Sequence, residues 1–272
     1  MWRWEWVALV YFSYLATVAA VHPGFARSRW PAFAAGAVAW TLLPFLASRS
    51  AGWSSDFVRA LVPVPVLLAG YWLSGSFFLR PMSQVERWLQ GIDDACLQWG
   101  VAQGWSNAVT RHAGRYLELA YLLVYFVVPA GAVTLIVAGR SDALERFWAS
   151  VMLAAFASYG MLPWIQTRPP RVRDDLDRHA GTNSPVLLRR LNLWVLGRAS
   201  IQVNTVPSGH AATATAVALA VGAAIPEARA ILFVVSGSIV LATVFGRYHY
   251  MLDSVAGVVV GIGAWALVTV LE

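Results

Sequence analysis

Lysine is absent from this chain of 272 residues, because all 20 basic residues are arginine. This excludes mechanisms that need a lysine, such as a Schiff base or the phosphate-binding lysine of a Walker-type loop. Charged residues are also scarce, at 12% of the chain, against about 25% in ordinary soluble domains. Cysteine occurs once, as Cys96, so no disulfide forms within the chain.

Hydrophobic residues make up 58% of the chain, and the mean hydropathy is +0.59. Long apolar runs separated by short polar loops are typical of integral membrane proteins. The sequence therefore predicts an all-α, polytopic membrane bundle of about eight transmembrane helices. The predicted spans lie at about residues 4–21, 32–47, 60–79, 116–138, 147–165, 208–225, 230–245 and 251–271.

The formal net charge of +6 does not indicate nucleic acid, because many arginines lie in loops near the predicted membrane ends. Arginines in such places favour lipid headgroups and other phosphates. We expect a multi-pass protein of the plasma membrane, with membrane lipids around it and no nucleic-acid partner. Arginines outside the predicted site divide equally between the two faces, so the positive-inside rule leaves the side of the site open.

Two segments between the spans are predicted to have roles of their own. In residues 84–103 the apolar residues follow helical spacing, while Glu86, Asp93 and other polar residues occupy the opposite side. This pattern predicts an amphipathic helix on the membrane surface, or else a helix packed on the protein's own loops. The polar stretch at 166–205 is long enough to suggest a functional loop.

The chain is accordingly divided into three parts. Residues 1–80 are predicted to form N-terminal transmembrane helices, residues 81–114 an amphipathic interfacial segment, and residues 115–272 a catalytic transmembrane core.

The first motif is Pro207-Ser208-Gly209-His210, directly before an apolar run. Proline and serine in this place predict a helix start with Ser208 as its N-cap. A helix N-terminus offers unpaired backbone N–H groups to a phosphate, and Gly209 would let a ligand oxygen approach the backbone. Taken alone, an ordinary capped helix with an interfacial histidine explains this motif better.

The second motif contains Arg247, His249 and Asp253. Residues four apart share one face of a helix, so the Asp253 carboxylate is predicted to accept a hydrogen bond from one imidazole nitrogen of His249. The other nitrogen is then available as a nucleophile or base. Arg247 adds planar donors suited to phosphate oxygens. The alternative is a structural ion pair between Asp253 and an arginine.

The third motif is Thr167-Arg168-Pro169-Pro170-Arg171, directly after the fifth predicted span. Its two prolines end the helix and hold the flanking arginines in place, so we expect Arg168 and Arg171 to bind phosphate. The remaining arginines of the loop are interpreted as a basic membrane boundary. These are Arg173, Arg178, Arg189, Arg190 and Arg198.

The order of the helices brings the three motifs to one membrane face. The fifth span ends where the sixth begins, and the seventh returns the chain to the same face before the eighth starts. Other polar residues near that face are left outside the site, as interfacial groups in contact with solvent. These are His22, His112, His179 and Glu118.

Pro-Ser-Gly-His, followed about forty residues later by His-x-x-x-Asp and preceded by an Arg-Pro segment, resembles the type 2 phosphatidic acid phosphatase superfamily. The resemblance covers about residues 147–271 and implies a six-helix core, preceded here by extra N-terminal helices. It implies that His249 attacks phosphorus to form a phosphohistidine, oriented by Asp253, while His210 protonates the leaving alkoxide. The phosphate-binding residues it implies are Arg168, Arg171, Ser208, Gly209 and Arg247.

Two positions depart from the common pattern of that family. Met161 stands where the first family motif has a lysine, and Thr243 where the third has an arginine. Arg247, two residues before His249, is in position to replace the missing arginine. This arrangement is similar to the inositol phosphorylceramide synthase branch, whose members transfer a phospho-headgroup between lipids.

These motifs predict a membrane lipid phosphatase or phosphotransferase, with a phosphorylated lipid as substrate and either water or a lipid alcohol as acceptor. The chemistry needs no metal and no cofactor. Asp174, Asp175 and Asp177 are interpreted as ion-pair partners of nearby arginines, and the aspartate pattern of CDP-alcohol phosphotransferases is absent. The alternative is an inactive transporter or lipid-binding scaffold of the same fold.

Overall fold

The computed structural model describes residues 1–49, 60–102, 105–172 and 186–271. Within these ranges the regular structure is helical, with one isolated bridge between Thr167 and Asn204. The all-α prediction is therefore confirmed. The helices are α1 (Arg3–Val21), η1 (Pro23–Ser28), α2 (Arg29–Arg49), α4 (Pro63–Gly75), α5 (Ser83–Ala102), α6 (Trp105–Val137), η3 (Ser141–Ala143), α7 (Leu144–Tyr159), α9 (Val186–Ala199), α10 (Gly209–Ala224), η4 (Pro226–Ala228), α11 (Arg229–Phe245) and α12 (Met251–Val270).

In the part of the chain that the structure describes, four stretches of helix are long and apolar enough to cross a bilayer. They are Arg3–Val21, Ala113–Val137, Pro226–Phe245 and Met251–Val270, and α10 is a shorter apolar helix. The protein is therefore an integral membrane protein with a helical bundle. The other predicted spans also fall on helices, namely α2, α4 and α7, and the number of eight remains a prediction.

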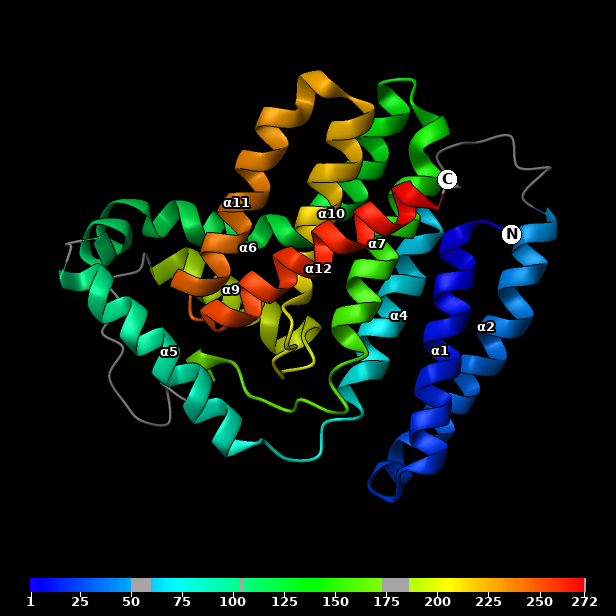
Figure 1. The fold of residues 1–272 in the computed structure, drawn as a ribbon, viewed down its shortest axis with the longest axis horizontal. Coiled ribbons are helices and arrows are strands. Elements are labelled where there is room, and N and C mark those ends of the chain that lie inside the picture. Colours follow the sequence, from blue (N-terminus) through cyan, green and yellow to red (C-terminus); the bar gives the residue numbers. More distant parts are fainter. Residues whose placement is uncertain (50–59, 103–104, 173–185, 272) are drawn as a thin grey trace.

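Helix α10 lies at the centre of the bundle and packs against α6, α7, α11 and α12 (Figure 1). Its side chains are mainly Ala, Thr and Val, and nearly all are buried. Small residues let neighbouring helices approach closely in a membrane protein. On α12, a Cβ at Gly257 or Gly261 would lie 2.5 Å from the carbonyl oxygen of Ser208 or Ala212. This close contact fixes the start of α12 against the start of α10.

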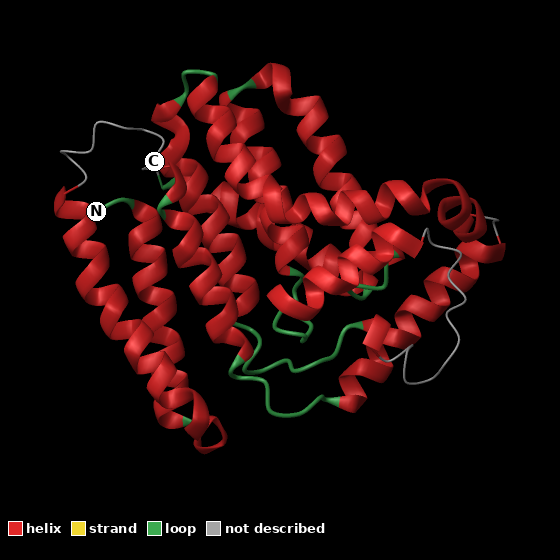
Figure 2. Cartoon of the chain, turned by 180° about the vertical axis from the view of Figure 1, so that it is seen from behind, coloured by secondary structure: helices red, strands yellow, loops and turns green. Residues whose placement is uncertain are grey.

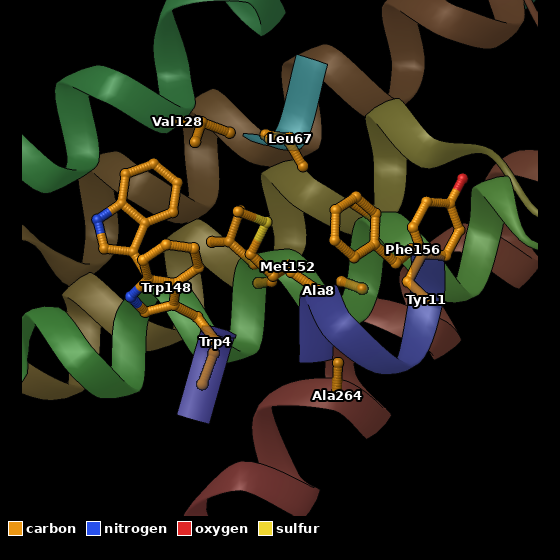
Figure 3. Close-up of a cluster of buried hydrophobic side chains, with 14 of the residues drawn as sticks. Trp4, Ala8, Tyr11, Leu67, Val128, Trp148, Met152, Phe156 and Ala264 are labelled. Carbon is orange, nitrogen blue, oxygen red and sulfur yellow. The ribbon is translucent and has the colours of Figure 1, made fainter. Parts of the chain in front are cut away.

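The N-terminal helices extend the same hydrophobic core. Helix α1 packs on α2 and α7, and the rings of Tyr11 and Phe156 stack with their centroids 4.1 Å apart. Trp4, Trp148 and Met152 lie in the same buried cluster (Figure 3). Seen from behind, the α1–α2 pair and helix α5 occupy opposite ends of the molecule (Figure 2).

Helix α5 packs against α6 and α12, and its faces differ from those predicted. Glu86 and Asp93 were expected on a solvated side, but each is only 2% exposed. They share the buried face with Leu89, whereas Trp88 is 58% exposed. The prediction of a solvated acidic face is wrong because arginines of the folded protein supply partners for both carboxylates.

Candidate active site

Two histidines from separate elements face one another. His210 lies in the first turn of α10, and His249 lies in the turn between α11 and α12. Nδ1 of His210 is 3.2 Å from Nε2 of His249, which is hydrogen-bonding distance. His249 is buried and His210 is half-buried. The structure thus brings together the two histidines that the sequence motifs place 39 residues apart.

The start of α10 is fixed by its own cap and by α12. Oγ of Ser208 accepts a hydrogen bond from the backbone N–H of Ala211, which confirms Ser208 as the N-cap. The N–H of Ser208 donates to the Asp253 carbonyl at 2.9 Å. At Gly209, a Cβ would lie 2.5 Å from Cε1 of Tyr159. This glycine therefore makes room for an aromatic ring, and its contact with a phosphate oxygen stays a prediction.

A tight turn after α11 presents His249. The Thr243 carbonyl accepts hydrogen bonds from the N–H groups of both Tyr248 and His249, each at 2.9 Å. Arg247 adopts the left-handed conformation, with φ of 59°, which costs a non-glycine residue about 1 kcal/mol. His249 precedes α12 and is not part of it, so its relation to Asp253 is not that of two residues on one helix.

Asp253 approaches His249 without a hydrogen bond. The distance from Nδ1 of His249 to Oδ2 of Asp253 is 3.9 Å. Oδ2 instead accepts from Nδ2 of Asn204 at 2.7 Å and from the N–H of Tyr250 at 3.1 Å. Among the described residues, Nδ1 of His249 and Oδ1 of Asp253 have no hydrogen-bond partner. Sequence reasoning missed Asn204, whose signal was an amide side chain just before the Pro-Ser-Gly-His motif.

Arg171 is the arginine that faces the histidines. Its backbone N–H donates to the Arg247 carbonyl at 3.0 Å, and its guanidinium lies 5.6 Å from the centre of the Tyr248 ring. The side chain is buried, and it lines a small cavity of about 20 Å³ together with both histidines. The other lining residues are Tyr71, Tyr121, Pro169, Leu196, Ser200, Val203, Thr205 and Tyr248.

Arg168 and Arg247 are engaged by carboxylates of α5. Arg168 makes two bonds to Glu86, from Nε at 3.1 Å and from Nη2 at 2.8 Å. Arg247 contacts Asp93 at 3.3 Å and Gln90 at 3.2 Å. Burial raises the pKa of Asp93 to about 6, so the ion pair with Arg247 weakens below that pH. The two arginines thus bind protein groups where the sequence predicted phosphate contacts.

A family model of the PAP2 superfamily matches residues 83–267, which is more than half of the chain. The chain belongs to the PAP2 superfamily. The matched part begins at α5 and ends within α12, so it contains all three motifs. No curated protein matches the chain, and no solved structure does. The finer likeness to the inositol phosphorylceramide synthase branch stays a prediction.

The two departures from the family pattern have different surroundings in this PAP2 protein. Thr243 is fully buried, and its hydroxyl lies 2.9 Å from that of Ser254. It therefore joins the end of α11 to the start of α12 in a place where an arginine would have no room. Met161 is 37% exposed, in the turn that follows α7.

A buried polar network supports the turn of His249 in this PAP2 protein. Glu118 is 4% exposed and accepts hydrogen bonds from Tyr248 Oη at 2.7 Å, Arg189 Nη1 at 3.0 Å and Asn192 Nδ2 at 2.5 Å. Tyr121 stacks on Tyr248 with ring centres 3.6 Å apart. Glu118 and Arg189 were expected at a solvated boundary, and that expectation is wrong because they neutralise each other inside the protein.

The electrostatic environment keeps His249 neutral. Burial lowers its pKa, and the nearby Arg171 guanidinium lowers it further, to about 3. A neutral imidazole carries the lone pair that a nucleophile needs. His249 is therefore in its reactive form at neutral pH.

Metal-ligating side chains do not gather in the described part of the chain, where no group of three or more His, Cys, Asp or Glu residues could hold an ion. Asp174, Asp175 and Asp177 lie outside the described residues, as do Arg173, Arg178 and His179. That the chemistry needs no metal or cofactor remains a prediction.

Proposed function

We propose that this PAP2 protein transfers the phospho-group of a lipid phosphate through a phosphohistidine on His249. The observation that carries the proposal is the 3.2 Å contact between Nδ1 of His210 and Nε2 of His249 in a cavity that Arg171 also lines. A nucleophile, a proton donor and a cation that meet at one point are what phosphoryl transfer requires. PAP2 membership supports a phosphatase or phosphotransferase.

In the first step, Nε2 of His249 attacks phosphorus, and the bond from phosphorus to the alcohol oxygen breaks. His210 acts here as the imidazolium, which the negative charge of the bound phosphate favours, and it donates the proton on Nδ1 to the leaving oxygen and becomes neutral. Arg171 offsets the negative charge on the phosphoryl oxygens. Asp253, held by Asn204, stabilises the positive charge that develops on His249. Ser208 and Gly209 support the oxygens through the start of α10, and Arg168 and Arg247 form the outer part of the basic site.

In the second step, water or an alcohol attacks the phosphohistidine, and His210 accepts the proton from it. The bond between Nε2 and phosphorus breaks, so both histidines return to their starting forms. A cavity of about 20 Å³ has room for about one water. The two imidazoles therefore separate when a phosphoryl group enters between them.

We further infer that the chain is a multi-pass protein of the plasma membrane with eight spans, and that its substrate is a phosphorylated lipid. The place of Arg247, two residues before His249, and the Pro169-Pro170-Arg171 element support an acceptor other than water, since both are similar to the transferase-like arrangement of the motifs. We infer that this acceptor is a lipid alcohol, because the site lies between membrane helices and lipids surround the protein.

The test is to incubate the purified protein, with EDTA present, with lipid monophosphates and phosphodiesters, each with and without a lipid alcohol. We expect acid-labile phosphate on the protein after brief exposure, and its loss in His249→Ala. Free phosphate identifies a hydrolase, and a new phospholipid identifies a transferase. His22→Ala is the matched control, because His22 is exposed and its side chain accepts a hydrogen bond from the neighbouring Gly24 N–H. Turnover that survives in His249→Ala would refute the proposal.

A further inference from the structure

A second cavity, of about 170 Å³, adjoins the one that holds the histidines. Tyr71 and His210 line both cavities, so the two meet at these side chains. The larger cavity lies between α4 and α6 and reaches α7 and the start of α10. Its remaining lining residues are Val64, Leu67, Leu68, Trp72, Val124, Tyr125, Val128, Pro129, Tyr159, Ala199 and Thr213.

The walls of this larger cavity are mainly hydrocarbon. Leu67 of α4 and Val128 of α6 both line it and are buried, and their side chains lie near one another (Figure 3). Leu68 and Trp72 are 40% and 52% exposed, so α4 also forms the outer wall towards the surroundings of the bundle. The indole N–H of Trp72 donates to the Ala199 carbonyl at 2.9 Å and thereby ties α4 to the end of α9.

We propose that this cavity binds the first carbons of the hydrocarbon chain of the alcohol that is esterified to the phosphate. The inference rests on the proposed function, in which His210 protonates the leaving oxygen. Because His210 lines both cavities, a carbon bonded to that oxygen can enter the larger one. Apolar walls favour a hydrocarbon there and disfavour a polar headgroup, which would lose its hydration.

The size and the polar groups of the cavity fit such a chain. A cavity of 150 Å³ is known to hold a benzene molecule, so about 170 Å³ has room for about six carbons. Tyr125 lies with its ring edge-on to that of His210, at 6.4 Å between centres. The hydroxyl of Tyr125 has no hydrogen-bond partner among the described residues. An alcohol oxygen beside His210 would supply that partner.

The inference also assigns a role to the N-terminal part of the chain. Val64, Leu67, Leu68 and Trp72 belong to α4, which precedes the segment matched by the PAP2 model, 83–267. The reactive groups therefore come from the family core, whereas one wall of the cavity for the substrate's chain comes from a helix outside it.

The test uses n-alkyl monophosphates from ethyl to dodecyl, below their micelle-forming concentrations, with kcat/KM as the readout. Each added methylene is expected to raise kcat/KM about fourfold until about six carbons, where the increase ends. Leu67→Phe fills the cavity and should lower the ratio of hexyl to ethyl phosphate at least tenfold. Leu67→Ala enlarges it and should move the plateau to longer chains. Leu241→Phe, on an exposed site of α11, is the matched control and should keep the wild-type ratio.

An unchanged ratio of hexyl to ethyl phosphate in both Leu67 variants would overturn the inference. Binding of hexylphosphonate and ethylphosphonate, which cannot be hydrolysed, separates this inference from the proposed function. If no alkyl phosphate is turned over, but hexylphosphonate binds more tightly than ethylphosphonate only while Leu67 is intact, the cavity assignment stands and the proposed function fails. Equal binding of the two phosphonates by the wild-type protein refutes the cavity assignment by itself.

Discussion

Arg168 and Glu86, which are 82 residues apart in the chain, form a two-point ion pair that joins the exit of α7 to α5. Oε1 of Glu86 also accepts the backbone N–H of Arg168 at 2.8 Å. The two side chains differ in exposure, because that of Arg168 is 31% exposed and that of Glu86 is 2% exposed. If Arg168 is lost, the carboxylate that remains is buried. If Glu86 is lost, the guanidinium that remains can reach solvent.

Arg168→Met is expected to destabilise the protein more than Glu86→Gln. The first removes the Arg168 cation from a buried carboxylate, which costs about 3 kcal/mol or more. The second leaves a guanidinium that can reach solvent and keeps a hydrogen-bond acceptor, which costs about 1 kcal/mol. The measurement is the free energy of unfolding in detergent micelles. Equal losses in the two variants would contradict this account of the pair.

Asn204→Ala is expected to lower kcat and leave KM nearly unchanged, because Asn204 holds Asp253 and lies behind the histidine that meets the substrate. Losing one hydrogen bond to a buried carboxylate costs about 1–3 kcal/mol. If all of this enters the activation barrier, the rate falls about fivefold to 150-fold. Steady-state kinetics on a lipid phosphate would measure both constants. A rise in KM alone would show that Asn204 acts on substrate binding.

The pH dependence of the free energy of unfolding should show that His249 is buried in its neutral form. Its pKa is about 3 in the folded protein and about 6.5 in the unfolded chain. Between these values the unfolded chain binds a proton that the folded protein does not, so stability is lost as the pH falls below about 6.5. The contribution of this single group is at most about 1.4 kcal/mol per pH unit.

His249→Gln removes this titration, so its free energy of unfolding should fall less steeply than that of the wild type between pH 6.5 and 4. Asp93 has the opposite sign, because its pKa is raised to about 6 by burial. The free energy of unfolding that Asp93 contributes is present at low pH and is lost as the pH rises through about 6. Asp93→Asn removes this dependence. Identical slopes in the wild type and His249→Gln would show that His249 is not buried in its neutral form.

Gly261→Ala is expected to lower both stability and activity. Its Cβ would lie 2.5 Å from the Ala212 carbonyl oxygen and would force α12 away from α10, at a cost of about 1–3 kcal/mol. The movement would also carry Asp253 away from Ser208, whose N–H donates to the Asp253 carbonyl.

Gly263→Ala is the matched control on the same helix, because a Cβ there meets nothing within 4 Å. Alanine has the higher helix propensity, so this variant should be more stable than the wild type by about 0.5–1 kcal/mol. Thermal unfolding of the two variants compares them directly. Equal effects would show that α10 and α12 are not in close contact.

Several features followed from the sequence because each depends on neighbours in the chain. Hydrophobic runs predicted the helices, and proline and serine before an apolar run predicted the cap at Ser208. The order of the helices predicted that His210 and His249 would lie at one end of the bundle, and their rings are in contact. These inferences needed only helical period, cap chemistry and the alternation of spanning directions.

Other features were decided by the tertiary structure, because they join residues far apart in the chain. Whether an arginine binds a phosphate or a carboxylate depends on what lies opposite, and for Arg168 and Arg247 this is α5. Glu118 is a centre of the polar network only because Arg189 and Tyr248 converge on it. The apolar cavity beside His210 likewise exists only because residues of α4, α6 and the start of α10 line one space, and no local pattern specifies that arrangement.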